Sequence, residues 1–311
     1  MFPSYEVLDN YTEQLGANEL RVVWLPDTSG YTNQTPDNFY AQTQWIADHR
    51  REIDVVLHVG DVVQHGSTTP AQWAVADTAI AKLDTWQVPY LLNMGNHDYD
   101  DQLAGADRPT ITWQQYFPQA RYTARPWWRG GFFEEGHSEN VYLIRSIRGT
   151  EYIFLNLEFG PRQAVIEWAD ALLTAHAAKT AIVTTHAYMY RDNSRMGSGD
   201  DYNPHTYGVD ADCHDGDELW TELIKLHDNI LWVQCGHDFV GGVAYRSDNS
   251  DGGQKIHQVM ANYEMNASNG GAYLRVVTFR LGLNVIDVKT YSPVAKAYLT
   301  AAANQYVVAA R

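Results

Sequence analysis

The sequence has few cysteines and no long apolar run. Two cysteines in 311 residues are too few for a disulfide framework. Cys213 and Cys235 are therefore expected to be buried free thiols, although one bridge between them stays open. No stretch of about 18 apolar residues occurs, so no membrane-spanning helix and no membrane partner are expected. The first residues show no basic or apolar signal region, so a cytoplasmic location is the default expectation, with secretion or a periplasmic location left open.

Basic residues are also scarce. The 22 Lys and Arg side chains face 38 Asp and Glu, which leaves a formal net charge of -16. Binding to long nucleic acid or to an anionic surface depends on clustered Lys and Arg, so neither is expected as a partner. An anionic substrate would be repelled unless a bound metal made its site locally positive. The sequence makes no prediction about the oligomeric state.

Apolar runs alternate with helical patterns in the first half of the chain. Strands are predicted at 20–25, 54–59 and 90–94, and helices over 36–51 and 70–86. This βαβαβ order predicts parallel strands joined by right-handed crossovers.

The second half continues with mixed elements around two irregular segments. Segment 99–139 is rich in aromatic residues and is predicted to be an insertion on the main body. Segment 187–216 is predicted to be a long polar loop near the active site. The remaining predicted elements are a hairpin at 141–147 and 152–157, helices at 162–177 and 216–228, and strands at 181–185, 230–235, 255–262, 272–280 and 284–291. A single domain over 1–311 with two sheets is expected.

Polar residues follow five of the predicted strands directly. They are Asp27, Gly60-Asp61, Gly95-Asn96-His97-Asp98, His186 and Gly236-His237. Open α/β sheets bind ligands at the carboxyl ends of their strands, so these loops are expected to meet in one crevice. The mixed oxygen and nitrogen donors suit Mn, Fe or Zn better than Ca or Mg. Each motif alone is also typical of a turn or a helix cap, but five equivalent placements favour a metal site.

In this order the motifs resemble those of the calcineurin-like metallophosphoesterases, from about residue 20 to residue 291. The opening Leu25-Pro26-Asp27-Thr28 is similar to that of a bacterial branch of this family. The resemblance implies a four-layer α/β/β/α sandwich of two mixed sheets. It also implies that Asp61 bridges two metals, that Asp27 holds the first, and that Asn96, His186 and His237 hold the second.

The resemblance further implies hydrolysis of a small phosphodiester or phosphomonoester by water, with the diester slightly favoured. His97 would aid the leaving group, while Asp98 or a nearby carbonyl would fix its imidazole. Asp27 is a further catalytic candidate, as a general base. Arg191, Arg195, Tyr188 and His65 are candidate substrate contacts, although loop arginines are often solvated and loop aromatics often only pack.

Two departures from the family pattern weaken the first metal position. Ser29 and Phe239 stand where the family has histidine ligands, so that position keeps only Asp27 and Asp61. One well-bound divalent transition metal (Mn, Fe or Zn) and a second, weaker ion are therefore expected. Candidate substitute ligands are Ser29, Asp238 and His65. The alternative function is a degenerate-site protein that binds a metal or another ligand without hydrolase activity.

Overall fold

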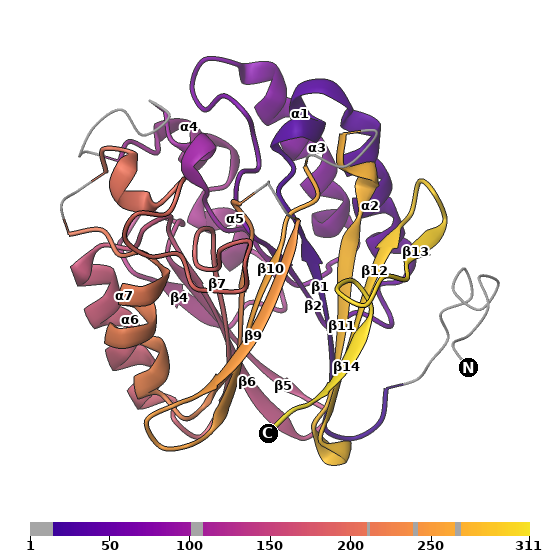
Figure 1. Cartoon of the computed structure of the whole chain (residues 1–311). Coiled ribbons are helices and arrows are strands. Elements are labelled where there is room, and N and C mark those ends of the chain that lie inside the picture. Colours follow the sequence, from indigo (N-terminus) through magenta and orange to yellow (C-terminus); the bar gives the residue numbers. More distant parts are fainter. Residues whose placement is uncertain (1–14, 101–107, 210–211, 239–241, 265–268) are drawn as a thin grey trace.

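Two mixed sheets form the centre of the molecule, with helices on their outer faces (Figure 1). The computed structural model describes residues 15–100, 108–209, 212–238, 242–264 and 269–311. The predicted fold class, a four-layer α/β/β/α sandwich, is confirmed. None of the helices within these ranges is long and apolar enough to cross a membrane.

The first sheet has the strand order β13-β12-β11-β1-β2-β3, and β14 pairs with β12. Strands β1, β2 and β3 are parallel, whereas β11 runs antiparallel to β1. Its strands are β1 (Glu19–Leu25), β2 (Val55–His58), β3 (Tyr90–Leu91), β11 (Leu274–Arg280), β12 (Val285–Ser292), β13 (Ala297–Leu299) and β14 (Tyr306–Ala309). Because β1, β2 and β3 are parallel, their carboxyl ends lie at the same edge of the sheet.

The second sheet has the strand order β4-β5-β6-β7-β8-β10-β9. Strands β6, β7, β8 and β10 are parallel, and β4, β5 and β9 are antiparallel to their neighbours. Its strands are β4 (Gly130–Phe132), β5 (Val141–Ile147), β6 (Thr150–Leu157), β7 (Thr180–Thr185), β8 (Ile230–Cys235), β9 (Val243–Asn249) and β10 (Lys255–Ala261).

Helices connect and cover these strands. The α-helices are α1 (Ser29–Gln34), α2 (Pro36–Asp48), α3 (Pro70–Thr85), α4 (Ile111–Tyr116), α5 (Gln119–Thr123), α6 (Gln163–Ala175) and α7 (Gly216–Glu222). The 3-10 turns are η2 (Asn96–Asp98), η3 (Pro204–Thr206), η4 (Ile224–Leu226), η5 (Asn269–Ala272) and η6 (Leu281–Leu283). The helix predicted over 216–228 ends at Glu222 because Leu223 leaves the helical region with φ of -134°.

The alternation of side chains in β6 shows why two cores form. Tyr152 and Phe154 belong to the core between the sheets, whereas Ile153 and Leu155 face the helices. Successive strand residues point to opposite faces, so a continuous apolar run is needed where both faces are covered. Cys213 and Cys235 are buried free thiols, as predicted.

The predicted insertion 99–139 lies partly outside the described residues, at 101–107. Its described part forms α4, α5 and β4, and its aromatic rings contact the main body. Trp113 and Phe117 lie 6.1 Å from Trp73 of α3, measured between ring centroids. Strands β4, β9, β13 and β14 were not predicted, because they are short or carry little apolar alternation.

Candidate functional site

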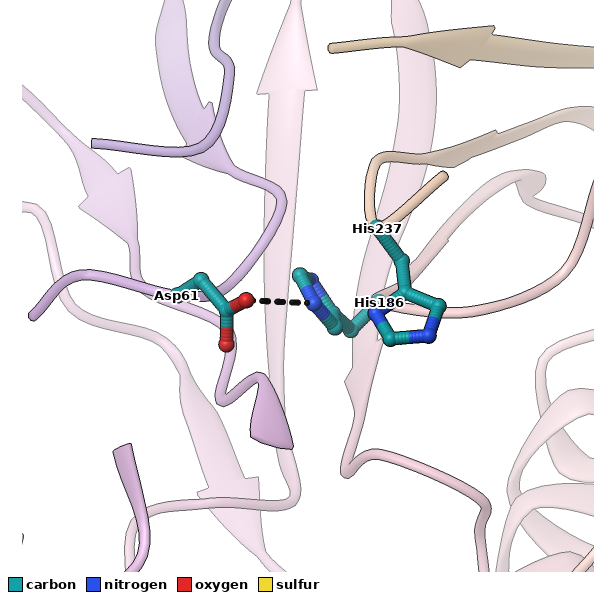
Figure 2. Close-up of side chains that lie close together, drawn as sticks. All are labelled: Asp61, His186 and His237. Atoms are coloured by element: carbon teal, nitrogen blue, oxygen red, sulfur yellow. Dashed lines mark ion pairs between the residues drawn. The ribbon is translucent and has the colours of Figure 1, made fainter. Parts of the chain in front are cut away.

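Three buried side chains from three different strand ends meet at one point (Figure 2). Asp61 follows β2, His186 follows β7, and His237 follows β8. One potential ligand atom from each lies within 4.8 Å of the others. The two sheets thus contribute one carboxylate and two imidazoles to a common position, as the strand-end rule predicts.

Two glycines make this close approach possible. A Cβ atom on Gly60, which has φ of +107°, would lie 2.6 Å from His186 Nδ1. A Cβ atom on Gly95 would lie 2.1 Å from Asp61 Oδ1. Asp61 itself has φ of +53°, a left-handed conformation that costs energy outside glycine. The backbone conformation of these loops therefore places Asp61 in contact with His186, although it requires a left-handed conformation at Asp61.

The hydrogen bond at Nδ1 of His186 directs the other ring nitrogen at Asp61. Nδ1 donates to the Val59 carbonyl at 2.9 Å, and Nε2 lies 3.1 Å from Asp61 Oδ2. Despite this short contact, Nε2 has no assigned hydrogen-bond partner. Burial opposes charge on the ring, yet the Asp61 carboxylate raises the pKa of His186 above its ordinary value. Asp61 and His186 therefore form a pair that accommodates either a proton or a metal ion.

His237 and Asn96 add two further donors. His237 Nε2 donates to the Tyr202 carbonyl at 2.8 Å, which leaves the lone pair on Nδ1. Burial lowers the pKa of His237 to about 3, so its ring is neutral at pH 7. Asn96 Oδ1 is buried without a hydrogen-bond partner. Two imidazole nitrogens, a carboxylate and an unsatisfied amide oxygen fit a transition metal such as Mn, Fe or Zn.

Comparison with known proteins identifies the family of this fold and site. The family model described as calcineurin-like phosphoesterase matches residues 20–241. The chain belongs to this family. The resemblance predicted from the motifs is thereby confirmed.

Two curated proteins are similar in sequence. The uncharacterized protein YvnB of Bacillus subtilis (strain 168) is 28% identical over 281 residues, which cover 88% of this chain and 20% of that protein. A probable cyclic nucleotide phosphodiesterase of Moraxella catarrhalis (strain BBH18) is 24% identical over 192 residues, 59% of this chain and 57% of that protein. This member of the family thus spans a fifth to about three fifths of the curated relatives it matches.

Solved structures of phosphatases share the fold. A dimetal phosphatase from Danio rerio superposes with a TM-score of 0.60 at 10% identity, covering 94% of this chain and 99% of that one. The purple acid phosphatase PPD1 from yellow lupin (Lupinus luteus) has a TM-score of 0.56 at 12% identity, covering 94% and 54%. At this identity the likeness establishes the fold alone.

A cavity of about 230 Å³ opens at the cluster. Its described lining residues are Asp61, Gln64, Asn96, His97, Tyr207, His237 and Glu264. The Tyr207 ring lies 5.6 Å from the ring of His237 and 5.2 Å from that of Phe159. The cavity therefore has one aromatic wall, and its size suits a small ligand.

Glu264, which lines the cavity, is linked through Ser29 to a further carboxylate, Asp27. Asp27 Oδ1 accepts a hydrogen bond from Ser29 N at 3.0 Å, and Ser29 Oγ donates to Glu264 Oε1 at 3.0 Å. Burial, followed by the charges of Glu264 and Asp61, raises the pKa of Asp27 well above its ordinary value. Burial and the charge of Asp61 likewise raise the pKa of Glu264. We call Asp27, Ser29 and Glu264 the carboxylate half, and Asn96, His186 and His237 the imidazole half.

His97 lines the cavity, but Asp98 does not orient it. Asp98 accepts hydrogen bonds from Val63 N at 3.0 Å and Gly95 N at 2.9 Å. The His97 Nδ1 atom instead lies 2.9 Å from the Gln64 carbonyl. Burial, with the charge of Asp61, raises the pKa of Asp98 to about 7. The prediction that Asp98 holds the imidazole is corrected in favour of its alternative, a nearby carbonyl, because the carboxylate is occupied by backbone amides.

Tyr188 and Arg195 were predicted to contact substrate, but the structure places both away from the cavity. Tyr188 is fully buried, and its hydroxyl donates to Gln258 Oε1 at 2.8 Å. The Arg195 guanidinium lies 4.1 Å from the centre of the Trp220 ring and donates to Asp248 at 3.2 Å. The contacts with Gln258, Trp220 and Asp248 hold both side chains within the fold instead of at the cavity.

Arg191, Asp238 and His65 also lie outside the described lining of the cavity. Arg191 Nε donates to Asp238 Oδ2 at 2.9 Å, which commits this carboxylate to an ion pair. The His65 amide donates to Gln72 Oε1 at 3.0 Å, and its side chain is half-buried. Phe239 lies outside the described residues. Arg191, Asp238 and His65 are thus not placed as predicted.

Glu264, Gln64 and Tyr207 line the cavity but were not predicted as site residues. Glu264 comes three residues after β10, just as Asp27 comes two residues after β1. Since a strand over 255–262 was predicted, the strand-end rule applied to it would have found Glu264. Gln64 and Tyr207 carry no comparable sequence signal, because they lie within irregular loops.

Proposed function

We propose that this chain is a metal-dependent hydrolase of small phosphoesters. The observation that carries the proposal is the buried cluster of Asp61, His186 and His237, with the unsatisfied Asn96 Oδ1 beside it. Asp61, Asn96, His186 and His237 would hold one well-bound ion, and Asp27 would contribute to a weaker position. Mn, Fe and Zn suit the two nitrogen and two oxygen donors of the well-bound position.

A bound divalent metal supplies Lewis acidity, which neutralises phosphoryl oxygens and lowers the pKa of water from 15.7 to about 7. The chain's own residues supply positioning and protons. His97 Nδ1 donates to the Gln64 carbonyl, so Nε2 is the nitrogen from which the doubly protonated ring would give a proton to the leaving oxygen, which returns the ring to the neutral form. Such a general acid contributes about 10²- to 10⁴-fold. Asp98 positions the loop by its two backbone hydrogen bonds, and buried Asp27 stays a candidate general base.

A diester is the favoured substrate class. The Moraxella catarrhalis relative bears the name of a probable cyclic nucleotide phosphodiesterase, which supports this preference. The cavity of about 230 Å³ has the size of a small-molecule site, and the ring of Tyr207 offers a stacking surface for a planar group.

The test is turnover of a chromogenic diester and of the matching monoester by metal-free protein to which Mn²⁺ is added back. Hydrolysis is expected to require the metal and to fall to background in Asp61→Ala and His186→Ala. Glu167→Gln, which removes one exposed carboxylate on α6, is the matched control and should behave as the unmodified protein.

A second candidate function is metal or ligand binding without hydrolysis. It is motivated by Ser29 and Phe239, which stand where the family has histidine ligands. If the protein binds metal yet cleaves neither ester, this second function replaces the first.

A further inference from the structure

A buried glutamine connects three segments near the cavity. Gln72 lies in the first turn of α3 and is only 3% exposed, although glutamine is mostly an exposed residue. Its Oε1 accepts hydrogen bonds from two consecutive backbone amides, Gln64 N at 2.9 Å and His65 N at 3.0 Å. Its Nε2 donates to Asn33 Oδ1 of α1 at 3.1 Å. These bonds fix both ends of the Gln72 side-chain amide.

The peptide group between Gln64 and His65 is held on both sides. Its N–H belongs to His65 and donates to Gln72 Oε1. Its C=O belongs to Gln64 and accepts from His97 Nδ1 at 2.9 Å. The described chain has no cis peptide bond, so the N–H and C=O of this planar group point in opposite directions. Gln72 and His97 are therefore joined through one rigid plane.

Gln64 also presents its side chain to the His97 ring. Its Nε2 atom lies 3.3 Å from the same Nδ1 atom. A neutral imidazole carries its proton on one nitrogen only, so Nδ1 either donates to the carbonyl or accepts from the side-chain amide. With the peptide plane held by Gln72, the carbonyl contact is the shorter of the two. The position of this plane therefore favours the proton on Nδ1.

Neighbouring contacts fix the next part of the loop. Trp73 Nε1 donates to the carbonyl of Gly66. Gly66 N in turn donates to the carbonyl of His97 at 3.1 Å. Removal of the Gln72 amide would leave these contacts at Gly66 in place but would take away the acceptor of two backbone amides. The expected result is a displaced peptide group within a loop that stays attached.

We propose that Gln72 is a positioning residue for His97 and acts through the peptide group between Gln64 and His65. It keeps the Gln64 carbonyl on Nδ1 and so leaves Nε2 as the nitrogen that serves a ligand. Gln72 is not among the described residues that line the cavity, so it acts on the ring and not on the substrate. The inference rests on the proposed function only for what Nε2 does, which is to protonate the leaving oxygen.

The leaving group separates this role from a merely structural one. An oxygen that is stable as an anion leaves without a proton, whereas a basic oxygen needs the general acid. Loss of Gln72 should therefore slow the hydrolysis of esters with a basic leaving oxygen and hardly affect esters with a stable one. A general distortion of the metal cluster would slow both alike.

The experiment uses Mn²⁺-loaded full-length protein and two diesters that differ only in the leaving group, methyl phenyl phosphate and methyl 4-nitrophenyl phosphate. Gln72→Leu should lower kcat for the phenyl ester by about tenfold or more, as part of the about 10²- to 10⁴-fold that a general acid contributes. The kcat for the nitrophenyl ester should stay within about twofold, and so should KM for both esters and the bound metal.

Two further variants sharpen this measurement. Gln72→Glu keeps an acceptor oxygen and should restore most of kcat, because the exposed Asn33 can turn its amide nitrogen toward the carboxylate. Gln44→Leu makes the same exchange at an exposed glutamine of α2 and should behave as the unmodified protein. If Gln72→Leu does not fold, Gln72→Asn takes its place, because it is shorter by one methylene yet stays polar.

Nitrogen NMR of the histidine rings tests the inference without turnover. Metal-free protein labelled with ¹⁵N-histidine is measured at about pH 8.5, where imidazole is ordinarily neutral. The signals of His97 are identified by their absence from His97→Gln. The Nδ1–H form is expected in the unmodified protein and in Gln72→Glu, and a mixture with the Nε2–H form in Gln72→Leu.

Two results would overturn the role of Gln72. They are an unchanged Nδ1–H signal of His97 in Gln72→Leu, and an equal loss of kcat for both diesters. If the unmodified protein cleaves neither diester, the proposed function fails, and the ring signals of His97 still decide whether Gln72 positions the imidazole.

Discussion

The imidazole half and the carboxylate half both lie at the ends of parallel strands, but their ligands are oriented differently. In the imidazole half, the carbonyls of Val59 and Tyr202 each fix one ring nitrogen and direct the other inward. In the carboxylate half, one residue, Ser29, contacts both carboxylates: its backbone amide donates to Asp27 and its hydroxyl donates to Glu264. A backbone carbonyl cannot be lost by substitution, whereas a serine hydroxyl can. The difference teaches that the imidazoles are oriented by backbone carbonyls alone, whereas the placement of Glu264 depends on one side-chain hydroxyl.

Asp61 is the residue that the two halves share, so its replacement should give the largest effect. Asp61→Asn is expected to remove both metal positions and to lower kcat/KM by more than about 10⁴-fold, beyond the contribution of one general acid. Metal analysis and diester turnover check this expectation, with Glu167→Gln as control. Retention of both metals would show that the halves are independent of Asp61.

His97 belongs to neither half, which allows proton transfer to be separated from metal binding. His97→Gln should lower kcat by about 10²- to 10⁴-fold, because glutamine cannot carry a proton to the leaving oxygen. Metal content should stay the same, since the His97 Nδ1 atom faces the Gln64 carbonyl rather than the cluster. Loss of metal in this variant would instead make His97 a ligand.

Replacement of Asp98 tests whether its hydrogen bonds to the backbone amides of Val63 and Gly95 support the imidazole half. Asp98→Asn places an amide nitrogen against Val63 N or Gly95 N, so one buried hydrogen bond is lost. The free energy of unfolding should fall by about 1–3 kcal/mol, and kcat by about 10- to 100-fold, as for residues that support a metal site. Urea denaturation and turnover measure both. A kcat loss equal to that of His97→Gln with unchanged stability would contradict the backbone role.

His257 is a buried histidine outside both halves, and its replacement should have the smallest effect on activity. Nδ1 lies 3.0 Å from the Tyr245 hydroxyl and Nε2 lies 3.2 Å from the Ala310 carbonyl, so both nitrogens are occupied. Burial lowers the pKa of His257 from 6.5 to about 4. Between pH 6.5 and about pH 4, His257 binds a proton in the unfolded chain but not in the folded chain, so the free energy of unfolding decreases as the pH falls.

When the pH falls from 7 to 5, the exclusion of this proton from folded His257 should lower the free energy of unfolding by about 2 kcal/mol. His257→Gln should lack that part of the pH dependence while keeping metal binding and turnover. Urea denaturation of the metal-free proteins at both pH values measures the difference. Equal pH dependence in the two proteins would mean that His257 does not titrate differently on folding.

Much of the architecture could be predicted because its signals are local. The strand over 230–235 and the helix over 70–86 carry clear periodicity, and their predicted bounds agree with β8 and α3 within one residue. The positions of Asp61, His186 and His237 followed from the strand-end rule, which needs only the order of elements. Short strands such as β13 and β14 could not be predicted, because their half-exposed residues alternate weakly.

The sequence by itself determined the fold class, the family and the group of residues at the strand ends, because these depend on local periodicity and on motif order. Only the tertiary structure decided the partners of those residues. In the folded chain Ser29 forms a hydrogen bond with Glu264, Asp98 with backbone amides, and Tyr188 with Gln258. Such contacts join segments tens to hundreds of residues apart, and they depend on how the two sheets pack rather than on any local preference.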